Sequence, residues 1–318
     1  MDHESHIPVV DLSHADASDV IDRACRNWGF LAVVNHGVEP GVLDESWNDA
    51  RRFFDLPESA RMAVAMPSVG YPYGYSPLNG ETLARSTGHD AAPDLKESFA
   101  IGPVEEPQHR FADSDEEFAW SPNLWPEDLP SLRDTWSARY LALAGLASRL
   151  LGHMAVALDL PPRHFEPLID RHTSAMRAIN YPGRATRSVP GSTDQWGASA
   201  HTDYGTLTIL QVDPSEPGLE VRRADGAWVD VFPPEGALVV NLGDAMERWT
   251  NDRWRSTLHR VRVPNGRRQS IAFFHNANWD AWIECIPSCL EPDAAPRHAP
   301  IQAGPHLMAK FTSTVNRY

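Results

Sequence analysis

The chain has 318 residues, of which 42% are hydrophobic, so it is long enough to bury one large core or two modest ones. Its formal charge of −15 opposes binding to the phosphate backbone of nucleic acids, and Lys96 and Lys310 are its only lysines. It has no polybasic run and no long stretch of uninterrupted apolar residues, so we expect a freely soluble protein without membrane association.

The cysteine content predicts a reducing environment. Cys25, Cys285 and Cys289 form neither a CxxC motif nor an even set for disulfides, and no secretory hydrophobic region follows Met1. We therefore expect a cytoplasmic protein. Cys285 and Cys289 are close in sequence but lack a second ligand pair, so we expect packing thiols and no structural zinc.

The first part of the chain predicts helices around one strand, followed by irregular structure. Residues 17–28 place apolar side chains at helical spacing, and residues 30–34 form a short apolar strand. Residues 40–54 predict a second amphipathic helix, stopped before Pro57. From residue 64 to residue 130, Pro, Gly and Asp recur, and we expect loops that partly line the mouth of a pocket.

The second part of the chain predicts one long helix and then many short strands. Residues 131–158 carry a wide apolar stripe, typical of a helix that braces a sheet from outside. From residue 175 onward, short strands alternate with turn signals such as Pro182-Gly183, as in a barrel. Residues 292–305 predict a loop, and residues 306–315 predict a short C-terminal helix.

His201, Asp203 and His259 form the strongest candidate metal site. Residues two apart in an extended segment point to the same side, so His201 and Asp203 can share one ion. Segments 236–244 and 256–263 predict two strands joined by a helix-prone stretch, and a closed antiparallel sheet would bring His259 to the same ion. Two imidazoles and one carboxylate occupy one face of a metal and leave the opposite face open for chemistry.

Arg268 and Ser270 follow His259 and predict a binding site for an acid. By the period-two rule they face one side of a strand, while Gln269 and Ile271 face the other. A guanidinium and a hydroxyl side by side can both bind one carboxylate. Together with the metal ligands, this pair predicts a cavity that holds a metal and an acid.

These motifs, in this order, resemble the isopenicillin N synthase-like family of iron(II)/2-oxoglutarate-dependent oxygenases. The likeness extends well beyond the ligands, to residues 7–12, 28–37, 53–57, 70–75, 94–99, 176–182, 241–250 and 257–261. The resemblance implies a mainly β fold with α: a distorted double-stranded β-helix, or jelly roll. A helical N-terminal region in residues 1–130 would pack against residues 131–318, the bracing helix and catalytic core, as one structural unit.

The resemblance also implies roles for the site residues. His201, Asp203 and His259 would bind Fe(II), and dioxygen would take a remaining metal position. The implied activity oxidises a small organic molecule, by hydroxylation or desaturation, while 2-oxoglutarate is decarboxylated to succinate and CO2. The far carboxylate of 2-oxoglutarate would be held by Arg268, Ser270 and Tyr181. Many relatives carry an asparagine two positions before this tyrosine, where this chain has Ile179.

Candidate substrate contacts come from two segments. Tyr71, Tyr73 and Tyr75 could close over a substrate, although glycine-flanked tyrosines also commonly pack a loop. If the strand that carries Arg268 has no bulge, Phe274 and Asn276 lie on the same inward face as Arg268 and could contact the substrate.

Four further polar residues are predicted to lie outside the metal site. We expect Lys96 and Glu97 to form a local ion pair, and His36 to be a structural, hydrogen-bonded histidine. His275 should face away from Ser270 and from the metal.

Three alternative functions remain open at this point. The first is an iron oxidase of the isopenicillin N synthase type, which uses no 2-oxoglutarate; its pattern has a glutamine near the C-terminus, whereas the last glutamine here is Gln302. The second is a zinc hydrolase, although no general base stands beside the motif. The third is a non-catalytic barrel that binds a small acid. Substrate and oligomeric state stay undetermined, and we favour a tailoring enzyme of specialised metabolism acting on an amino-acid-derived or terpenoid compound.

Overall fold

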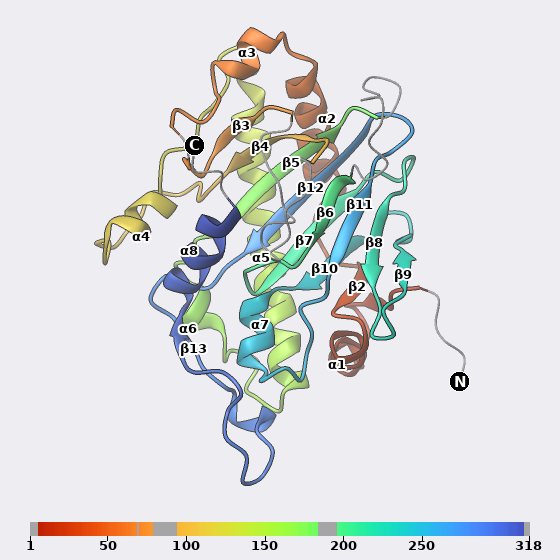
Figure 1. The fold of residues 1–318 in the computed structure, drawn as a ribbon, viewed down its shortest axis with the longest axis vertical. Coiled ribbons are helices and arrows are strands. Elements are labelled where there is room, and N and C mark those ends of the chain that lie inside the picture. Colours follow the sequence, from red (N-terminus) through yellow and green to blue (C-terminus); the bar gives the residue numbers. More distant parts are fainter. Residues whose placement is uncertain (1–5, 69, 79–93, 184–195, 315–318) are drawn as a thin grey trace.

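Two β-sheets packed face to face form the centre of the molecule (Figure 1). The computed structural model describes residues 6–68, 70–78, 94–183 and 196–314. The larger sheet has eight strands in the order β1-β2-β10-β7-β12-β5-β4-β3, and the smaller has four in the order β6-β11-β8-β9. This arrangement confirms the predicted jelly-roll core.

The strands of the two sheets and of the additional β13–β14 pair have the following bounds: β1 Val9–Asp11, β2 Phe30–Val34, β3 Gly74–Ser76, β4 Glu97–Ile101, β5 Ala175–Tyr181, β6 Trp196–His201, β7 Leu207–Val212, β8 Leu219–Arg222, β9 Trp228–Asp230, β10 Leu238–Leu242, β11 His259–Arg262, β12 Arg268–His275, β13 Trp282–Ile283 and β14 Ile301–Gln302. The α-helices are α1 Ala17–Asn27, α2 Pro40–Asp55, α3 Glu58–Met62, α4 Ser114–Ala119, α5 Ser131–Ala157, α6 Glu166–Ile169, α7 Asp244–Trp249 and α8 Ala303–Thr314.

The long helix α5 braces the larger sheet from outside, as predicted. It lies behind this sheet in Figure 1 and packs against α1, α2 and β12. Its apolar stripe is fully buried, including Leu143, Leu146, Leu150 and Met154. By length and composition alone, α5 is apolar enough to cross a membrane. In this fold the apolar residues of α5 instead form the core between helices and sheet.

A second apolar core fills the space between the two sheets. Phe30 and Val239 contribute from the larger sheet, and Ala198, Leu219 and Val261 contribute from the smaller one. Packing on both faces explains why the larger sheet contains strands with continuous apolar runs, such as β2 and β10. The site residues described below project from strands that border this core.

Part of the segment predicted as loops is regular structure. Strands β3 and β4 pair with each other, and β4 pairs with β5, so residues 74–76 and 97–101 extend the larger sheet. Helix α4 also lies in this segment, and its N-cap Asp113 accepts hydrogen bonds from the backbone of Asp115 and Glu116. The all-loop prediction for residues 64–130 was therefore wrong for these elements, because their strands are too short to show a clear alternation.

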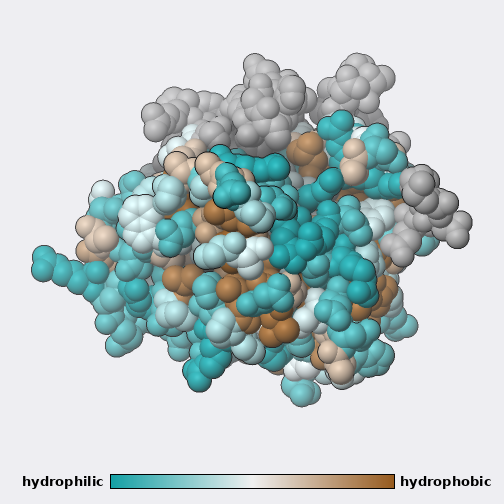
Figure 2. Space-filling view, turned by 90° about the horizontal axis from the view of Figure 1, so that it is seen from below, coloured by the Kyte–Doolittle hydropathy of each residue, from teal (hydrophilic) through white to brown (hydrophobic). Residues whose placement is uncertain are grey.

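An apolar cleft of about 570 Å³ lies on the surface beside α6 and β13. Its lining includes Leu168, Trp249, Trp282 and Ile286. Figure 2, the view from below Figure 1, shows apolar surface gathered among polar side chains at this end of the molecule. None of the predicted metal, cosubstrate or substrate residues lines the cleft, so it is separate from the candidate active site.

Candidate functional site

His201, Asp203 and His259 converge on one point. His201 ends β6 and His259 begins β11, and the two residues are direct partners in the antiparallel register. Oδ1 of Asp203 is 3.9 Å from Nε2 of His201 and 3.7 Å from Nε2 of His259. The three ligand atoms lie within 4.8 Å of one another. These separations fit one ion bound by each ligand at about 2.0–2.2 Å.

Backbone carbonyls orient both histidine rings toward that point. Nδ1 of His201 is 2.7 Å from the carbonyl oxygen of Ser199, and Nδ1 of His259 is 3.1 Å from that of Thr257. A carbonyl oxygen only accepts, so each Nδ1 carries the proton and each Nε2 keeps its lone pair. The lone pair is then available to a metal, which is the usual arrangement of metal-binding histidines.

The carboxylate of Asp203 is held by two neighbours that sequence reasoning missed. Its Oδ2 accepts hydrogen bonds from Nδ2 of Asn241, at 2.7 Å, and from Oγ1 of Thr208, at 2.5 Å. These bonds leave Oδ1 for the metal. Asn241 lies on β10 and Thr208 on β7, so two strands of the larger sheet support a ligand that follows β6 of the smaller one. The only sequence signal was that Asn241 opens one of the segments that carried the family resemblance.

The protonation states suit metal binding. Burial, followed by the neighbouring His259, lowers the pKa of His201 to about 3, although Asp203 opposes this shift. Burial alone would raise the pKa of Asp203, but His259 and His201, together with the hydrogen bonds from Asn241 and Thr208, hold it below its ordinary value. A neutral imidazole and an ionised carboxylate are the forms that bind a metal.

Strand β6 is anchored at Ser199, next to its metal ligand. Oδ1 of Asp94 accepts hydrogen bonds from the backbone N–H of Ser199, at 2.9 Å, and from its hydroxyl, at 2.7 Å. Because the carbonyl of Ser199 orients His201, Asp94 fixes this histidine indirectly. Sequence reasoning did not identify this role for Asp94.

The predicted ion pair between Lys96 and Glu97 was wrong. The Lys96 ammonium lies 4.0 Å from Asp94, whereas Glu97 pairs with Arg61 and accepts a hydrogen bond from Asn180 at 2.7 Å. Adjacent residues in an extended segment point to opposite faces, which separates the two side chains.

Arg268 and Ser270 lie on β12, both buried, and face the inner side of the larger sheet together with Tyr181. Nε of Arg268 donates to the carbonyl oxygen of Glu216 at 3.1 Å. Its NH1 is buried and has no hydrogen-bond partner among the residues that the structure describes. Leaving a buried guanidinium nitrogen unpaired is costly, so this group fits an anion such as the far carboxylate of 2-oxoglutarate.

Family comparisons cover both parts of the chain. A family described as the non-haem dioxygenase in morphine synthesis N-terminal region matches residues 7–128, and the 2OG-Fe(II) oxygenase superfamily matches residues 173–277. The chain belongs to the 2OG-Fe(II) oxygenases. This membership agrees with the metal triad and confirms the family resemblance seen in the sequence motifs.

Individual relatives of this oxygenase span nearly its whole length. It is 35% identical to the 2-oxoglutarate-Fe(II) type oxidoreductase hxnY of Emericella nidulans, over 98% of this chain and 90% of that protein. It is 32% identical to the validamycin A dioxygenase of Streptomyces hygroscopicus subsp. limoneus, over 88% and 79%. The crystal structure of a full-length Neurospora crassa protein in complex with alpha-KG matches with a TM-score of 0.84 at 27% identity, covering 98% of each chain.

The protein is therefore an Fe(II)- and 2-oxoglutarate-dependent dioxygenase that uses dioxygen as co-substrate. The comparisons do not favour the alternative iron oxidase that uses no 2-oxoglutarate. They also support an enzyme rather than a non-catalytic barrel that binds a small acid.

The predicted substrate residues Phe274 and Asn276 have different surroundings. β12 pairs with β5 without a register shift, so Phe274 stays on the same face as Arg268. It lies opposite Thr208, which donates a hydrogen bond to Asp203. The amide of Asn276 instead donates to the backbone carbonyl of Thr173 at 2.9 Å. Of the two, Phe274 is the one that lies opposite a residue supporting Asp203.

The three predicted substrate tyrosines make contacts within the N-terminal region. The Tyr71 hydroxyl donates to the carbonyl of Pro122 at 2.7 Å, and the buried Tyr73 hydroxyl donates to that of Ala119. The Tyr75 hydroxyl donates to the carboxylate of Glu97. All three hydroxyls thus bind acceptors within the protein, and a substrate contact for these tyrosines stays a prediction.

The two histidines predicted to lie outside the metal site, His36 and His275, are where the sequence placed them. Nδ1 of His36 accepts from the backbone N–H of Val38, and its Nε2 donates to the carbonyl of Gly236, both at 3.1 Å. His275 is buried and hydrogen-bonded to Thr206 at 2.7 Å. The structural role of His36 and the orientation of His275 away from the metal are confirmed.

Proposed function

We propose that this oxygenase hydroxylates or desaturates a small organic molecule of specialised metabolism, with Arg268, Ser270 and Tyr181 holding 2-oxoglutarate. The observation that carries the proposal is the buried, unpaired NH1 of Arg268 among the described residues, in a chain whose metal ligands converge. A small-molecule substrate is supported by relatives: one is named validamycin A dioxygenase, and the Neurospora crassa protein has also been solved with alpha-KG and thymine.

Each site residue has a separate task in this proposal. His201, Asp203 and His259 hold Fe(II), which together with 2-oxoglutarate and dioxygen supplies the oxidation and releases succinate and CO2. Arg268 stays charged at any working pH, so it anchors the cosubstrate carboxylate and moves no proton. Phe274 forms part of the wall against which the substrate packs.

The decisive experiment measures succinate and oxidised product together. Purified enzyme with Fe(II), ascorbate and 2-oxoglutarate is incubated with a panel of amino-acid-derived and terpenoid compounds. We expect one succinate per product and no product when 2-oxoglutarate is left out. Substrate oxidation that proceeds without 2-oxoglutarate and without succinate would instead support the iron oxidase alternative.

A second test addresses the clamp. Arg268→Ala should weaken 2-oxoglutarate binding and leave Fe(II) binding intact, because Arg268 is not a metal ligand. Full 2-oxoglutarate-dependent turnover by Arg268→Ala would show that the clamp is wrongly assigned.

We also propose that the enzyme is cytoplasmic. Cys25, Cys285 and Cys289 are free thiols, and burial raises the pKa of each. Unreactive free thiols are typical of proteins in a reducing compartment. Recovery of a tagged chain in the secreted or membrane fraction of its host cell would contradict this proposal.

A further inference from the structure

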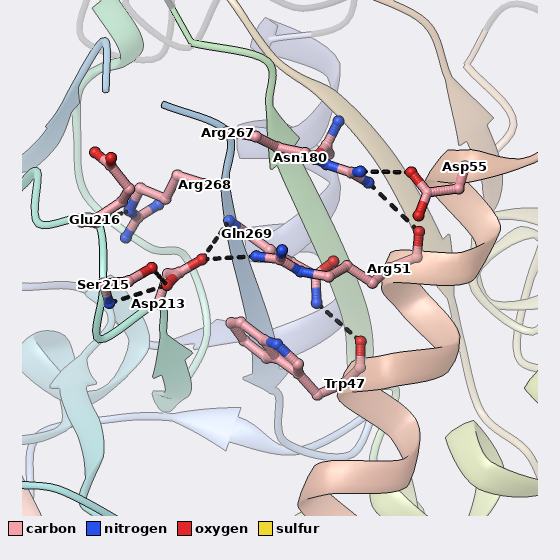
Figure 3. Close-up of polar contacts among 10 residues, drawn as sticks. All are labelled: Trp47, Arg51, Asp55, Asn180, Asp213, Ser215, Glu216, Arg267, Arg268 and Gln269. Atoms are coloured by element: carbon pink, nitrogen blue, oxygen red, sulfur yellow. Dashed lines mark hydrogen bonds and ion pairs between the residues drawn. The ribbon is translucent and has the colours of Figure 1, made fainter. Parts of the chain in front are cut away.

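The strand that carries Arg268 is attached to helix α2 by the residues on either side of this arginine (Figure 3). Nε2 of Gln269 donates to the carbonyl of Trp47 at 3.0 Å, and the guanidinium of Arg267 pairs with Asp55. Side chains alternate along a strand, so Arg267 and Gln269 point to α2 while Arg268 points to the inner face. The helix therefore contacts the back of the cosubstrate clamp.

Asp213 links this helix to the clamp. It follows β7, and its side chain is only 4% exposed. Its Oδ2 accepts from NH2 of Arg51, on α2, at 3.1 Å and from the backbone N–H of Gln269 at 3.3 Å. Its Oδ1 accepts from the backbone N–H of Ser215 at 3.0 Å and from the Ser215 hydroxyl at 2.6 Å. One carboxylate thus joins α2, β12 and the turn after β7.

That turn supplies the contact that orients Arg268. The bonds to Ser215 fix the backbone that leads into Glu216, and the carbonyl of Glu216 accepts from Nε of Arg268 at 3.1 Å. With Nε fixed in this way, the guanidinium plane is set and NH1 is left for a ligand. A clamp held in its productive geometry before binding does not lose conformational entropy when the ligand arrives.

We infer that Asp213, charge-paired with Arg51, is a positioning residue for 2-oxoglutarate: it fixes the turn whose Glu216 carbonyl holds Arg268 ready for the cosubstrate carboxylate. The inference rests on the proposed role of Arg268. It assigns a task in cosubstrate binding to helix α2, which belongs to the N-terminal region and carries none of the proposed iron or 2-oxoglutarate residues.

The test measures 2-oxoglutarate binding to the full-length, Fe(II)-loaded protein by calorimetry without dioxygen. Asp213→Asn and Arg51→Met should each weaken 2-oxoglutarate affinity about tenfold, because each removes a hydrogen bond between charged groups. Arg51→Lys should restore most of the affinity, and Fe(II) affinity should not change. Arg52→Met is the matched control, since Arg52 is the next arginine on α2, is 63% exposed and pairs with Asp49 instead.

Kinetics and a double-mutant cycle separate positioning from a general loss of structure. KM for 2-oxoglutarate should rise in Asp213→Asn and Arg51→Met, while kcat at saturating 2-oxoglutarate stays within about twofold of the parent. In an Arg268→Met background, Asp213→Asn should have no further effect on affinity, because it acts through Arg268.

The outcomes are distinguishable. If Arg268→Met weakens 2-oxoglutarate binding but Asp213→Asn and Arg51→Met do not, the positioning role is overturned and the clamp stands. If Arg268→Met has no effect, the proposed clamp itself fails. Should Asp213→Asn fail to fold, Arg51→Met at a partly exposed site carries the test alone, and unchanged affinity in that variant overturns the inference.

Discussion

Arg268 and Tyr181 lie directly opposite each other across the β5–β12 pair, with 5.0 Å between the guanidinium carbon and the centroid of the tyrosine ring. Both side chains are buried. The ring limits the guanidinium on one side, and the Glu216 carbonyl fixes its Nε. The proposed clamp is therefore assembled from two strands and one turn, which come together only when the barrel closes.

The two parts of the Tyr181 side chain can be tested separately. Tyr181→Phe keeps the ring and removes the hydroxyl proposed to contact 2-oxoglutarate, so affinity should fall about threefold to tenfold. Tyr181→Leu also removes the ring that faces Arg268, and we expect a loss of more than tenfold. Titration of the Fe(II)-loaded variants with 2-oxoglutarate in the absence of dioxygen measures both. Wild-type affinity in Tyr181→Leu would exclude a role for this residue.

The partners of Asp203 should control iron affinity. Asn241→Leu and Thr208→Val each remove a hydrogen bond to Oδ2 of Asp203 and nearly preserve volume. We expect Fe(II) binding to weaken about 10-fold to 100-fold, as is typical for residues that orient a metal ligand. Metal titration with a competing chelator measures this.

Thr202→Val is the matched control for that experiment. Its hydroxyl is in the same segment but contacts Asp244 at 3.4 Å, and no contact with Asp203 is described for it. Iron affinity equal in Asn241→Leu and in Thr202→Val would contradict the proposed role of Asn241.

The sequence predicted those parts of the fold whose pattern is local. Helix 40–54, strand 30–34 and the long helix 131–158 were located within a residue or so, because apolar periodicity and Pro or Gly at the ends define them. The candidate metal triad was predicted for a related reason. His201 and Asp203 are two positions apart in an extended segment, and a closed antiparallel sheet was expected to bring His259 to them, as the register of β6 and β11 does.

Outside the candidate metal triad, the polar contacts between distant segments were not predicted. Asp213 and Arg51 are 162 positions apart, and nothing near either residue marks the other. Strands β3 and β4 are short, and they are stabilised as strands by pairing within the larger sheet rather than by their own pattern. The Lys96–Glu97 pair was predicted from adjacency alone, whereas strand alternation sends the two side chains to opposite faces.

Gly205, two positions after Asp203, permits a close backbone approach to the end of β12. A Cβ at this position would lie 2.3 Å from the carbonyl oxygen of His275 and 2.4 Å from Oδ1 of Asn276. The first of these atoms is backbone, so it cannot move aside cheaply. Gly205→Ala should therefore lower the free energy of unfolding by about 1–3 kcal/mol or more.

Gly41→Ala is the control for that substitution. No atom lies within 4 Å of a Cβ built at Gly41, which is in helix α2, so alanine should leave stability unchanged or raise it by up to about 1 kcal/mol. Urea unfolding of the metal-free proteins measures both. A Gly205→Ala protein as stable as Gly41→Ala would show that the backbone can relax.

Half-buried His172 should make the fold sensitive to acid. Burial lowers the pKa of His172 to about 4, and its ring packs against those of Tyr140, Phe273 and His275. The unfolded chain has a histidine pKa near 6.5, so below that pH it binds a proton that the folded chain does not. Stability contributed by the neutral ring is complete above pH 6.5 and falls as pH drops toward 4, by about 3 kcal/mol at pH 4.

His172→Phe removes this titration and keeps an aromatic ring in the same packing. Between pH 6.5 and 4, its free energy of unfolding should fall less steeply than that of the parent, which urea unfolding at a series of pH values would measure. His14→Gln is the control, because the side chain of His14 is 68% exposed and no buried ring depends on it. The same slope in His172→Phe and in the parent would mean that other groups cause the acid sensitivity. If the dependence of the free energy of unfolding on pH is reduced only in His172→Phe, the acid sensitivity arises in the aromatic cluster between α5 and β12.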